Sequence, residues 1–282
     1  MANKTPDVTL LERIAASLER LAPKAEKPLR LDGSDAFVWQ PQTHALIPVE
    51  DTKALPLHLL LGIDQQKSIL LANTERFQNK LPANNALLWG ARGTGKSSIV
   101  KAIHASLKAP RPALVEIHRE DLSSLPGLLS GLKAIDRQVI LFCDDLSFDK
   151  NDTSYKSLKA VLDGGLTGRP DNVIFYATSN RRHLMPRDMM ENERATAINP
   201  AEAVEEAVSL SDRFGIWLGF HNYNQQRYLE IVYAYADHFT LPTDGLEPAA
   251  KEWSVTRGAR SGRIAWQFIQ DWAGRHGKRL TL

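Results

Sequence analysis

The sequence predicts an α/β fold in which helices flank a parallel sheet, followed by a small all-helical subdomain. Between about residues 58 and 221, short apolar runs alternate with segments of helical periodicity. Such alternation is typical of strand–helix–strand units, whose right-handed crossovers produce a parallel sheet covered on both faces. A glycine-rich loop joins one apolar run to the helical pattern that follows it. After residue 221 the apolar residues recur only at helical spacing, which indicates helices without strands.

The bulk composition excludes several classes of protein. The chain has 282 residues and a formal net charge of +2, which is not typical of proteins that coat nucleic acid or bind membranes through basic clusters. The single cysteine, Cys143, excludes an internal disulfide framework and suits a reducing compartment. No apolar run is long enough to cross a bilayer, and the first residues lack a secretory apolar core. We therefore expect a cytoplasmic protein without a membrane partner.

The N-terminal region, residues 1–57, is expected to form a helix and an extended arm. Apolar residues at helical spacing predict a helix that ends before Pro23. The aromatic island around Trp39 lies among prolines and indicates an extended segment that lies on another surface. The helix either packs on the protein's own core or docks on a partner. Its apolar stripe consists of Leu10, Leu11, Ile14, Leu18 and Leu21.

Five apolar runs are expected to form the strands of the sheet, the fifth being the weakest candidate. They are short and rich in aliphatic and aromatic residues, as buried parallel strands are. The runs cover residues 86–89, 113–117, 139–143, 173–177 and 216–220.

Two apolar stripes predict helices near the C-terminus. We therefore divide the chain into the N-terminal region, an α/β core over residues 58–221 and a helical subdomain over residues 222–282. The stripes consist of Tyr228, Ile231, Val232 and Tyr235, and of Ile264, Ala265, Phe268 and Trp272.

Residues 90–97 match the phosphate-binding pattern G-x-x-x-x-G-K-[ST] at every fixed position. Glycines let successive backbone N–H groups point at a phosphate, and the helix that follows presents its positive end to the same anion. Lys96 is expected to reach the β- and γ-phosphates, and Ser97 to hold Mg²⁺. The alternative is a glycine-rich turn without a ligand. The expected nucleotide-binding residues are Gly90, Ala91, Arg92, Gly93, Thr94, Gly95, Lys96, Ser97 and Ser98.

Polar residues follow the apolar runs at 139–143 and 173–177, at the strand ends where parallel sheets bind ligands. Asp144 is expected to help hold Mg²⁺ through water, and Asp145 to polarise the attacking water. Asn180 is expected to hydrogen-bond both the γ-phosphate and that water. The alternative for all three residues is that they cap the turns in which they lie.

These elements, in this order, resemble the AAA+ ATPases, and within them a bacterial family of predicted ATPases whose function is unassigned. The resemblance runs from about residue 58 to about residue 275. It is carried by the motifs at residues 87–98, 141–148, 177–184 and 210–215. It implies a P-loop NTPase core with a helical lid, ATP and Mg²⁺ as cofactors, and a homo-oligomer.

The resemblance also implies individual roles. Asn180 matches the sensor-1 position, and Arg213 matches the arginine finger that reaches the nucleotide of the neighbouring subunit in AAA+ rings. Arg263 matches sensor 2. Gly62 and Ile63 belong to a segment that resembles the adenine-contacting segment.

Two of these roles have alternatives in the sequence. Arg213 could instead pair with Asp212 or another acid of its own chain. Arg263 could be a solvated residue at the start of a helix, and Arg260 is a rival for its role.

Three departures from the AAA+ pattern bear on function. The usual Asp-Glu pair is Asp-Asp here, and the shorter side chain favours slow turnover. The loop at residues 120–127 lacks the aromatic-apolar-glycine element with which threading unfoldases grip polypeptide. The asparagine that often switches the catalytic acid has no clear counterpart, and Glu116 and His118 are only weak candidates.

We therefore expect an ATPase that works at a subunit interface and couples hydrolysis to lid motion and to remodelling or loading of an unknown client. The alternative is a nucleotide-gated binding module with little or no hydrolysis. A small-molecule kinase is disfavoured by the Arg213 motif and the C-terminal lid. Scattered histidines argue against zinc, and the short basic run at residues 275–279 does not indicate nucleic-acid binding.

Overall fold

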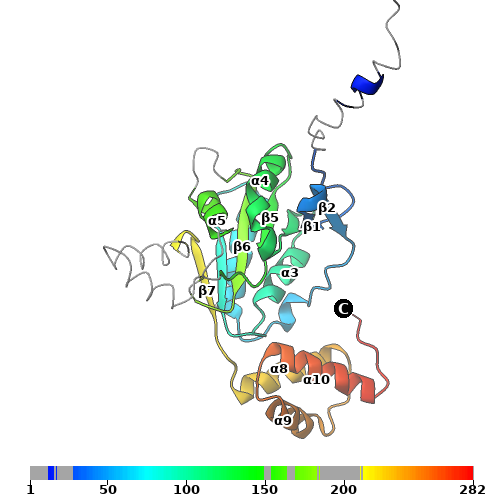
Figure 1. Ribbon diagram of the computed structural model, residues 1–282. Helices are drawn as coiled ribbons and strands as arrows, with labels where there is room; N and C mark the ends of the chain where they lie inside the picture. Colours follow the sequence, from blue (N-terminus) through cyan, green and yellow to red (C-terminus); the bar gives the residue numbers. More distant parts are fainter. Residues whose placement is uncertain are drawn as a thin grey trace, which may run out of the picture.

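The computed structural model describes residues 12–15, 17, 28–148, 154–163, 169–182, 184, 210 and 212–281. These residues contain a seven-stranded sheet of order β2-β1-β4-β5-β6-β3-β7 (Figure 1). All neighbouring strands are parallel except β1 and β2. The strands are β1 (Ala36–Gln40), β2 (Ala45–Val49), β3 (Ala86–Gly90), β4 (Ala113–Glu116), β5 (Val139–Cys143), β6 (Val173–Ser179) and β7 (Ile216–Phe220).

The predicted parallel α/β fold is confirmed, and all five predicted strands are present. β5 is buried along its whole length, because helices cover both faces of the sheet. Leu141 points to a cluster formed with α4 (Leu125–Lys133) and α5 (Ser154–Leu162). Its neighbours Ile140 and Phe142 point to the opposite cluster, formed with α2 (Asp64–Gln78) and α3 (Lys96–Ser106). The strand alternation therefore distributes the core over both faces.

Within the segment before residue 58, residues 36–49 form the β1–β2 hairpin, two extended strands that the sequence did not predict as part of the sheet. Phe37 and Trp39 are buried, and the Trp39 indole N–H donates to the Ser124 hydroxyl at 2.8 Å. β1 pairs in parallel with β4 and thus covers an edge that the predicted sheet would leave open. Pro48 had argued against a strand, but it lies in edge strand β2, where a missing N–H is tolerated.

The predicted N-terminal helix lies largely outside the described residues. Of its apolar stripe only Ile14 is described, within a short helical stretch, and its side chain is exposed. None of the helices among the described residues is both long and apolar enough to span a membrane.

The C-terminal residues form a bundle of three helices beyond β7 (Figure 1). The two predicted helices are α8 (Gln225–His238) and α10 (Gly262–Arg275), and α9 (Leu246–Thr256) lies between them in sequence. Short 3-10 helices cover Pro41–Thr43 (η1), Leu57–Leu59 (η2) and Arg119–Ser124 (η3).

The segment before α2 joins the two parts of the molecule. Leu59 is buried in the cluster of the C-terminal bundle, together with residues of α8 and α10. Leu60 and Ile63 are buried in the cluster beneath the sheet. Successive residues of one short segment therefore anchor the bundle to the sheet.

Candidate functional site

The glycine-rich loop connects β3 to α3 in a conformation that demands glycine. Gly90, Gly93 and Gly95 have φ angles of 134°, 74° and 95°. A Cβ atom at Gly90 would lie 1.9 Å from the carbonyl oxygen of Phe220 on β7. The N-cap residue of α3 is Gly95, which has no side chain to accept a hydrogen bond from the backbone N–H groups of the first turn. Such a helix end is suited to an anion.

Lys96 is buried, and its ammonium group is held by three acceptors. It donates to the carbonyl oxygens of Gly90 and Ala91 at 2.9 and 2.7 Å and to the Asn180 side-chain oxygen at 3.1 Å. Burial lowers the pKa of Lys96 from its usual value, while Asp144 and Asp145 oppose that shift. The two carboxylates therefore favour the charged form of Lys96, although its ammonium group is partly removed from water.

Asp144 connects the loop to the neighbouring strand. Its Oδ1 accepts hydrogen bonds from the hydroxyl groups of Ser97 and Thr178, each at 2.5 Å. A hydroxyl and a carboxylate on one water-accessible edge fit Mg²⁺, which prefers few protein ligands, several waters and phosphate oxygens.

Asp145 and Asn180 form the other half of this edge. Asp145 adopts a left-handed backbone conformation with φ of 53°, and its N–H donates to the Thr178 hydroxyl at 2.9 Å. The Asn180 amide donates to the Asp145 carboxylate while its oxygen accepts from Lys96. One amide thus links the lysine of the loop to the second aspartate.

Thr178 is a residue of the site that the sequence did not single out. β6 continues to Ser179, two residues beyond the predicted strand end. Cys143, the last residue of β5, pairs with Ala177 of β6. The residues that follow these two, Asp144 and Thr178, therefore lie side by side. Only the register of two neighbouring strands could have identified this contact.

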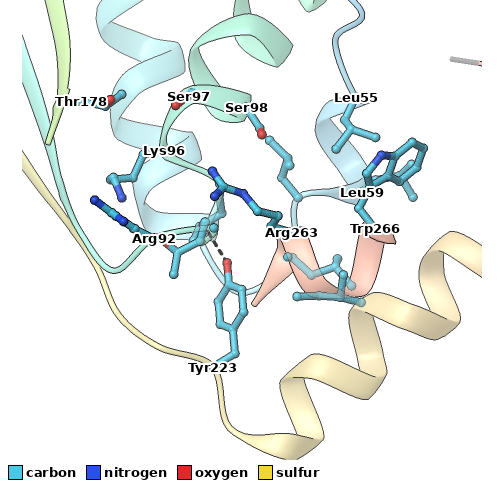
Figure 2. Close-up of a pocket in the computed structure, with 18 of the residues that line it drawn as sticks. Leu55, Leu59, Arg92, Lys96, Ser97, Ser98, Thr178, Tyr223, Arg263 and Trp266 are labelled. Carbon is cyan, nitrogen blue, oxygen red and sulfur yellow. Dashed lines mark hydrogen bonds between the residues drawn. The ribbon is translucent and has the colours of Figure 1, made fainter. Parts of the chain in front are cut away.

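A pocket of about 630 Å³ extends from this edge to the C-terminal bundle (Figure 2). Its polar end contains the loop, both aspartates and Asn180. Its other end is mainly apolar and is lined by three groups of residues: Leu55, Leu59, Leu60, Leu61 and Ile63 before α2; Ile231 and Tyr235 on α8; and Trp266 on α10. A cavity with one polar and one apolar end is suited to a nucleotide.

Of the two residues predicted to contact the base, Ile63 and Gly62, only one lines the pocket. Ile63 lines the pocket. Gly62 is not among the lining residues, and a Cβ atom there would lie 2.9 Å from Cδ of Arg227 on α8. Gly62, with φ of 76°, therefore permits close packing of the bundle against the segment before α2.

The bundle touches the phosphate loop directly. The backbone N–H of Arg263 donates to the carbonyl oxygen of Gly93 at 3.2 Å. The Tyr223 hydroxyl donates to the carbonyl oxygen of Thr94 at 2.9 Å. Burial raises the pKa of Tyr223 to about 12, so it stays a donor at neutral pH. Arg263 lines the pocket, whereas its rival Arg260 does not. Tyr223 had no signal in the sequence, because its partner is a backbone atom.

Arg213 lies away from this pocket in its own chain. Its guanidinium forms an ion pair with Asp163, at the end of α5. The acid that pairs with it is therefore Asp163, a residue that the sequence did not indicate.

A smaller pocket of about 220 Å³ adjoins the two aspartates on the side of η3. Glu116 and His118, the two weak candidates for a switch residue, both line it together with Asp144 and Asp145. The geometry thus brings both candidates beside the acidic pair without favouring either of them.

Comparisons with known proteins identify one family and several similar structures. A family model described as "Protein of unknown function (DUF815)" matches residues 32–276. No curated protein matches the chain. The structure is similar to that of the Orc1 protein of Aeropyrum pernix in complex with DNA, with a TM-score of 0.53 and 16% identity over 78% of this chain and 65% of that one.

Similar structures also include the RuvB Holliday junction branch migration motor of Thermotoga maritima. For one such structure the TM-score is 0.41, with 14% identity over 74% of this chain and 67% of that one. For a point mutant of RuvB the TM-score is 0.48, with 18% identity over 79% of this chain and 66% of that one. At such identities the likeness concerns the fold alone. The strand order and the similarity to Orc1 agree with the AAA+ P-loop fold that the motifs led us to expect.

Proposed function

The chain belongs to the family of proteins of unknown function DUF815, and from its own site we propose that it binds ATP with Mg²⁺ and hydrolyses it. The observation that carries this proposal is a continuous set of hydrogen bonds. It runs from Ser97 through Asp144 and Thr178 to Asp145, and through Asn180 to Lys96, at the polar end of the pocket. A phosphate-binding lysine, a metal-binding pair and a water-positioning pair are thus joined in one place.

Each group has a distinct task in this proposal. The backbone of residues 90–97 and the Lys96 ammonium bind the β- and γ-phosphates, as the geometry of such loops allows. Ser97 and Asp144 hold Mg²⁺, which supplies charge neutralisation for the phosphates when it is bound. Ile63 contributes apolar surface at the base end of the proposed site, and Gly62 beside it allows the bundle to pack close to this segment.

Asp145 and Asn180 act on the water molecule that attacks the γ-phosphorus. The Asn180 amide holds the Asp145 carboxylate, which accepts a proton from that water. A bond forms between the water oxygen and phosphorus, the bond to the β–γ bridging oxygen breaks, and the electron pair leaves with ADP. The products are ADP and inorganic phosphate, so the reaction needs no further reactant.

Two contacts between the lid and the loop support a proposed coupling of hydrolysis to lid motion. We propose that Arg263 and Tyr223 transmit the state of the phosphate site to α8 and α10, because they bond to consecutive carbonyl groups of the loop. Remodelling or loading of a client is the proposed output, and the client is unknown.

Arg213 is proposed to complete the site of a neighbouring subunit in a homo-oligomer. Such a finger is worth about 10³–10⁵ in rate. To act in this way it would exchange Asp163 for phosphate oxygens, which a planar guanidinium pairs with in the same geometry.

Steady-state phosphate release tests the hydrolysis. We expect the wild type to turn over ATP and Lys96→Ala to lose that activity, and equal activity of the two proteins would refute the proposal. Mixing Arg213→Ala with Asp145→Asn tests the finger, because one mixed interface then carries an intact acid and an intact arginine. Absence of rescue, with a monomer by light scattering in ATP, would exclude action in trans.

The second candidate function is a nucleotide-gated binding module with little or no hydrolysis. It is favoured by the short second acid, Asp145, whose carboxylate is held by Asn180. Single-turnover assays distinguish the two functions: a switch of this kind would bind ATP tightly and release phosphate over many minutes or not at all.

A further inference from the structure

Arg92 is the exposed side chain of the phosphate loop. The other residues of the stretch 90–97 are buried or half-buried, whereas Arg92 is exposed and lines the mouth of the pocket. It takes no part in the ion pairs of the described residues, whose arginines are Arg111, Arg119, Arg137, Arg213, Arg227 and Arg275. An arginine therefore stands at the entrance with its charge uncompensated by a salt bridge among the described residues.

The backbone on both sides of Arg92 is fixed. The Ala91 N–H donates to the Phe220 carbonyl at 3.0 Å, and the Ala91 carbonyl accepts from the Thr94 hydroxyl at 2.8 Å. The Gly93 carbonyl accepts from the Arg263 N–H. These bonds hold the backbone at Arg92 in place, so only the side chain has to be ordered when a ligand binds at the loop.

The charge of Arg92 acts on the same place as that of Lys96. Figure 2 shows the guanidinium of Arg92 and the ammonium of Lys96 on the same side of the loop. Arg92 and Lys96 therefore present two positive charges to the same part of the pocket, which suits an anionic ligand.

The charged lining of the pocket is also unbalanced. Four cationic residues and two carboxylates line it: Lys53, Arg92, Lys96, Arg263, Asp144 and Asp145. A magnesium-bound triphosphate supplies negative charge to this lining, and its terminal phosphate would lie at the end of the loop that carries Lys96. A diphosphate lacks the terminal phosphate, and Arg92 would then have no phosphate partner.

We propose that Arg92 contacts the terminal phosphate within its own subunit and makes the site select a triphosphate over a diphosphate. This inference rests on the proposed binding of ATP at the loop. The guanidinium offers donors in a planar fork that suits phosphate oxygens, and it stays charged at any physiological pH. Because Arg213 is paired with Asp163 in its own chain, the arginines that line the pocket of an isolated subunit are Arg92 and Arg263. The subunit thereby keeps a basal rate of hydrolysis when it is dilute.

Binding of MgATP and MgADP to the full-length protein, measured by isothermal titration calorimetry, tests the proposal. Hydrogen bonds to charged groups lead us to expect that Arg92→Ala weakens ATP binding about 10-fold or more and ADP binding less than about 2-fold. Arg92→Lys keeps the charge and should recover part of the loss. Arg30→Ala is the matched control, because Arg30 is exposed and is not part of the pocket lining.

Single-turnover phosphate release at high dilution supplies a second measurement. We expect Arg92→Ala to slow it about 100-fold or more, and Arg30→Ala to leave it unchanged. Equal losses of ATP and ADP affinity, or no loss of either in a folded Arg92→Ala protein, would overturn the role of Arg92 while the proposed ATP binding stands. A wild type that binds neither nucleotide would overturn both. Should Arg92→Ala not fold, Arg92→Gln gives the same comparison with the length of the side chain retained.

Discussion

Replacement of Thr178 by valine tests how the neighbouring strand positions the metal-binding edge. The Thr178 hydroxyl donates to the Asp144 carboxylate and accepts from the Asp145 N–H, and the residue is 1% exposed. Valine keeps the shape and the strand preference but removes the hydroxyl. The change therefore withdraws one donor from Asp144 and leaves a backbone N–H of Asp145 without its partner.

The size of the effect follows from these two bonds. Loss of a hydrogen bond to a charged group, or an unsatisfied N–H, costs about 1–3 kcal/mol, so we expect the free energy of unfolding to fall by about that amount. Outer-shell partners of metal ligands typically contribute about 10–100-fold to metal affinity, and we expect the Mg²⁺ concentration for half-maximal ATP hydrolysis to rise within that range. Thr178→Ser should restore most of the Mg²⁺ affinity, because it restores the hydroxyl.

Thr74→Val is the matched control. Thr74 is also buried, and its hydroxyl also has two partners, the Leu70 carbonyl at 2.7 Å and the Tyr176 hydroxyl at 2.9 Å. These partners lie outside the pocket lining. Urea unfolding should show similar losses of stability for both variants, but only Thr178→Val should change the Mg²⁺ requirement. If the two variants need the same Mg²⁺ concentration, Thr178 does not position Asp144 and the reasoning fails.

Two further predictions concern the loop and the helix that follows it. Gly90→Ala should destabilise the fold by several kcal/mol in urea unfolding, because its Cβ would lie 1.9 Å from the Phe220 carbonyl and φ is 134°. The control Gly127→Ala meets nothing within 4 Å and should be neutral or stabilising, so equal effects would contradict the close approach. His104 on α3 is buried against the Pro112 carbonyl at 3.0 Å, and burial lowers its pKa below the usual 6.5. The unfolded chain then binds this proton more readily than the folded one, so stability should fall as the pH drops from about 6.5 through the folded pKa and should be flat below it. His104→Asn should lose less stability over the same pH range, and a parallel loss in both proteins would rule out His104 as the cause.

The paired state of Arg213 bears on how an assembly would work. Its ion pair with Asp163 holds the arginine on its own subunit, next to α5. A half-exposed pair of this kind is worth little, so phosphate oxygens could replace the carboxylate at low cost. In the isolated subunit Arg213 is therefore held by Asp163, and it can be released from this ion pair to act as the proposed finger.

Much of the α/β core was predictable because its signals are local. The strands from β3 to β7 are apolar runs bounded by turn residues, and each was found within two residues of its ends. The hairpin of β1 and β2 was missed because prolines normally argue against strands, and only an edge position makes Pro48 acceptable. Helix α9 was not specified either, since its apolar face becomes evident only against α8 and α10.

By itself, the sequence determined the loop, the five apolar strands from β3 to β7 and the acids that follow β5. These features depend on the spacing of residues that are neighbours along the chain. Tertiary structure alone decided that Thr178 lies beside Asp144, that Tyr223 and Arg263 bond to the loop, and that Arg213 pairs with Asp163. Each of these contacts joins residues far apart in sequence, so it depends on strand register and on the packing of the lid, which no local spacing encodes.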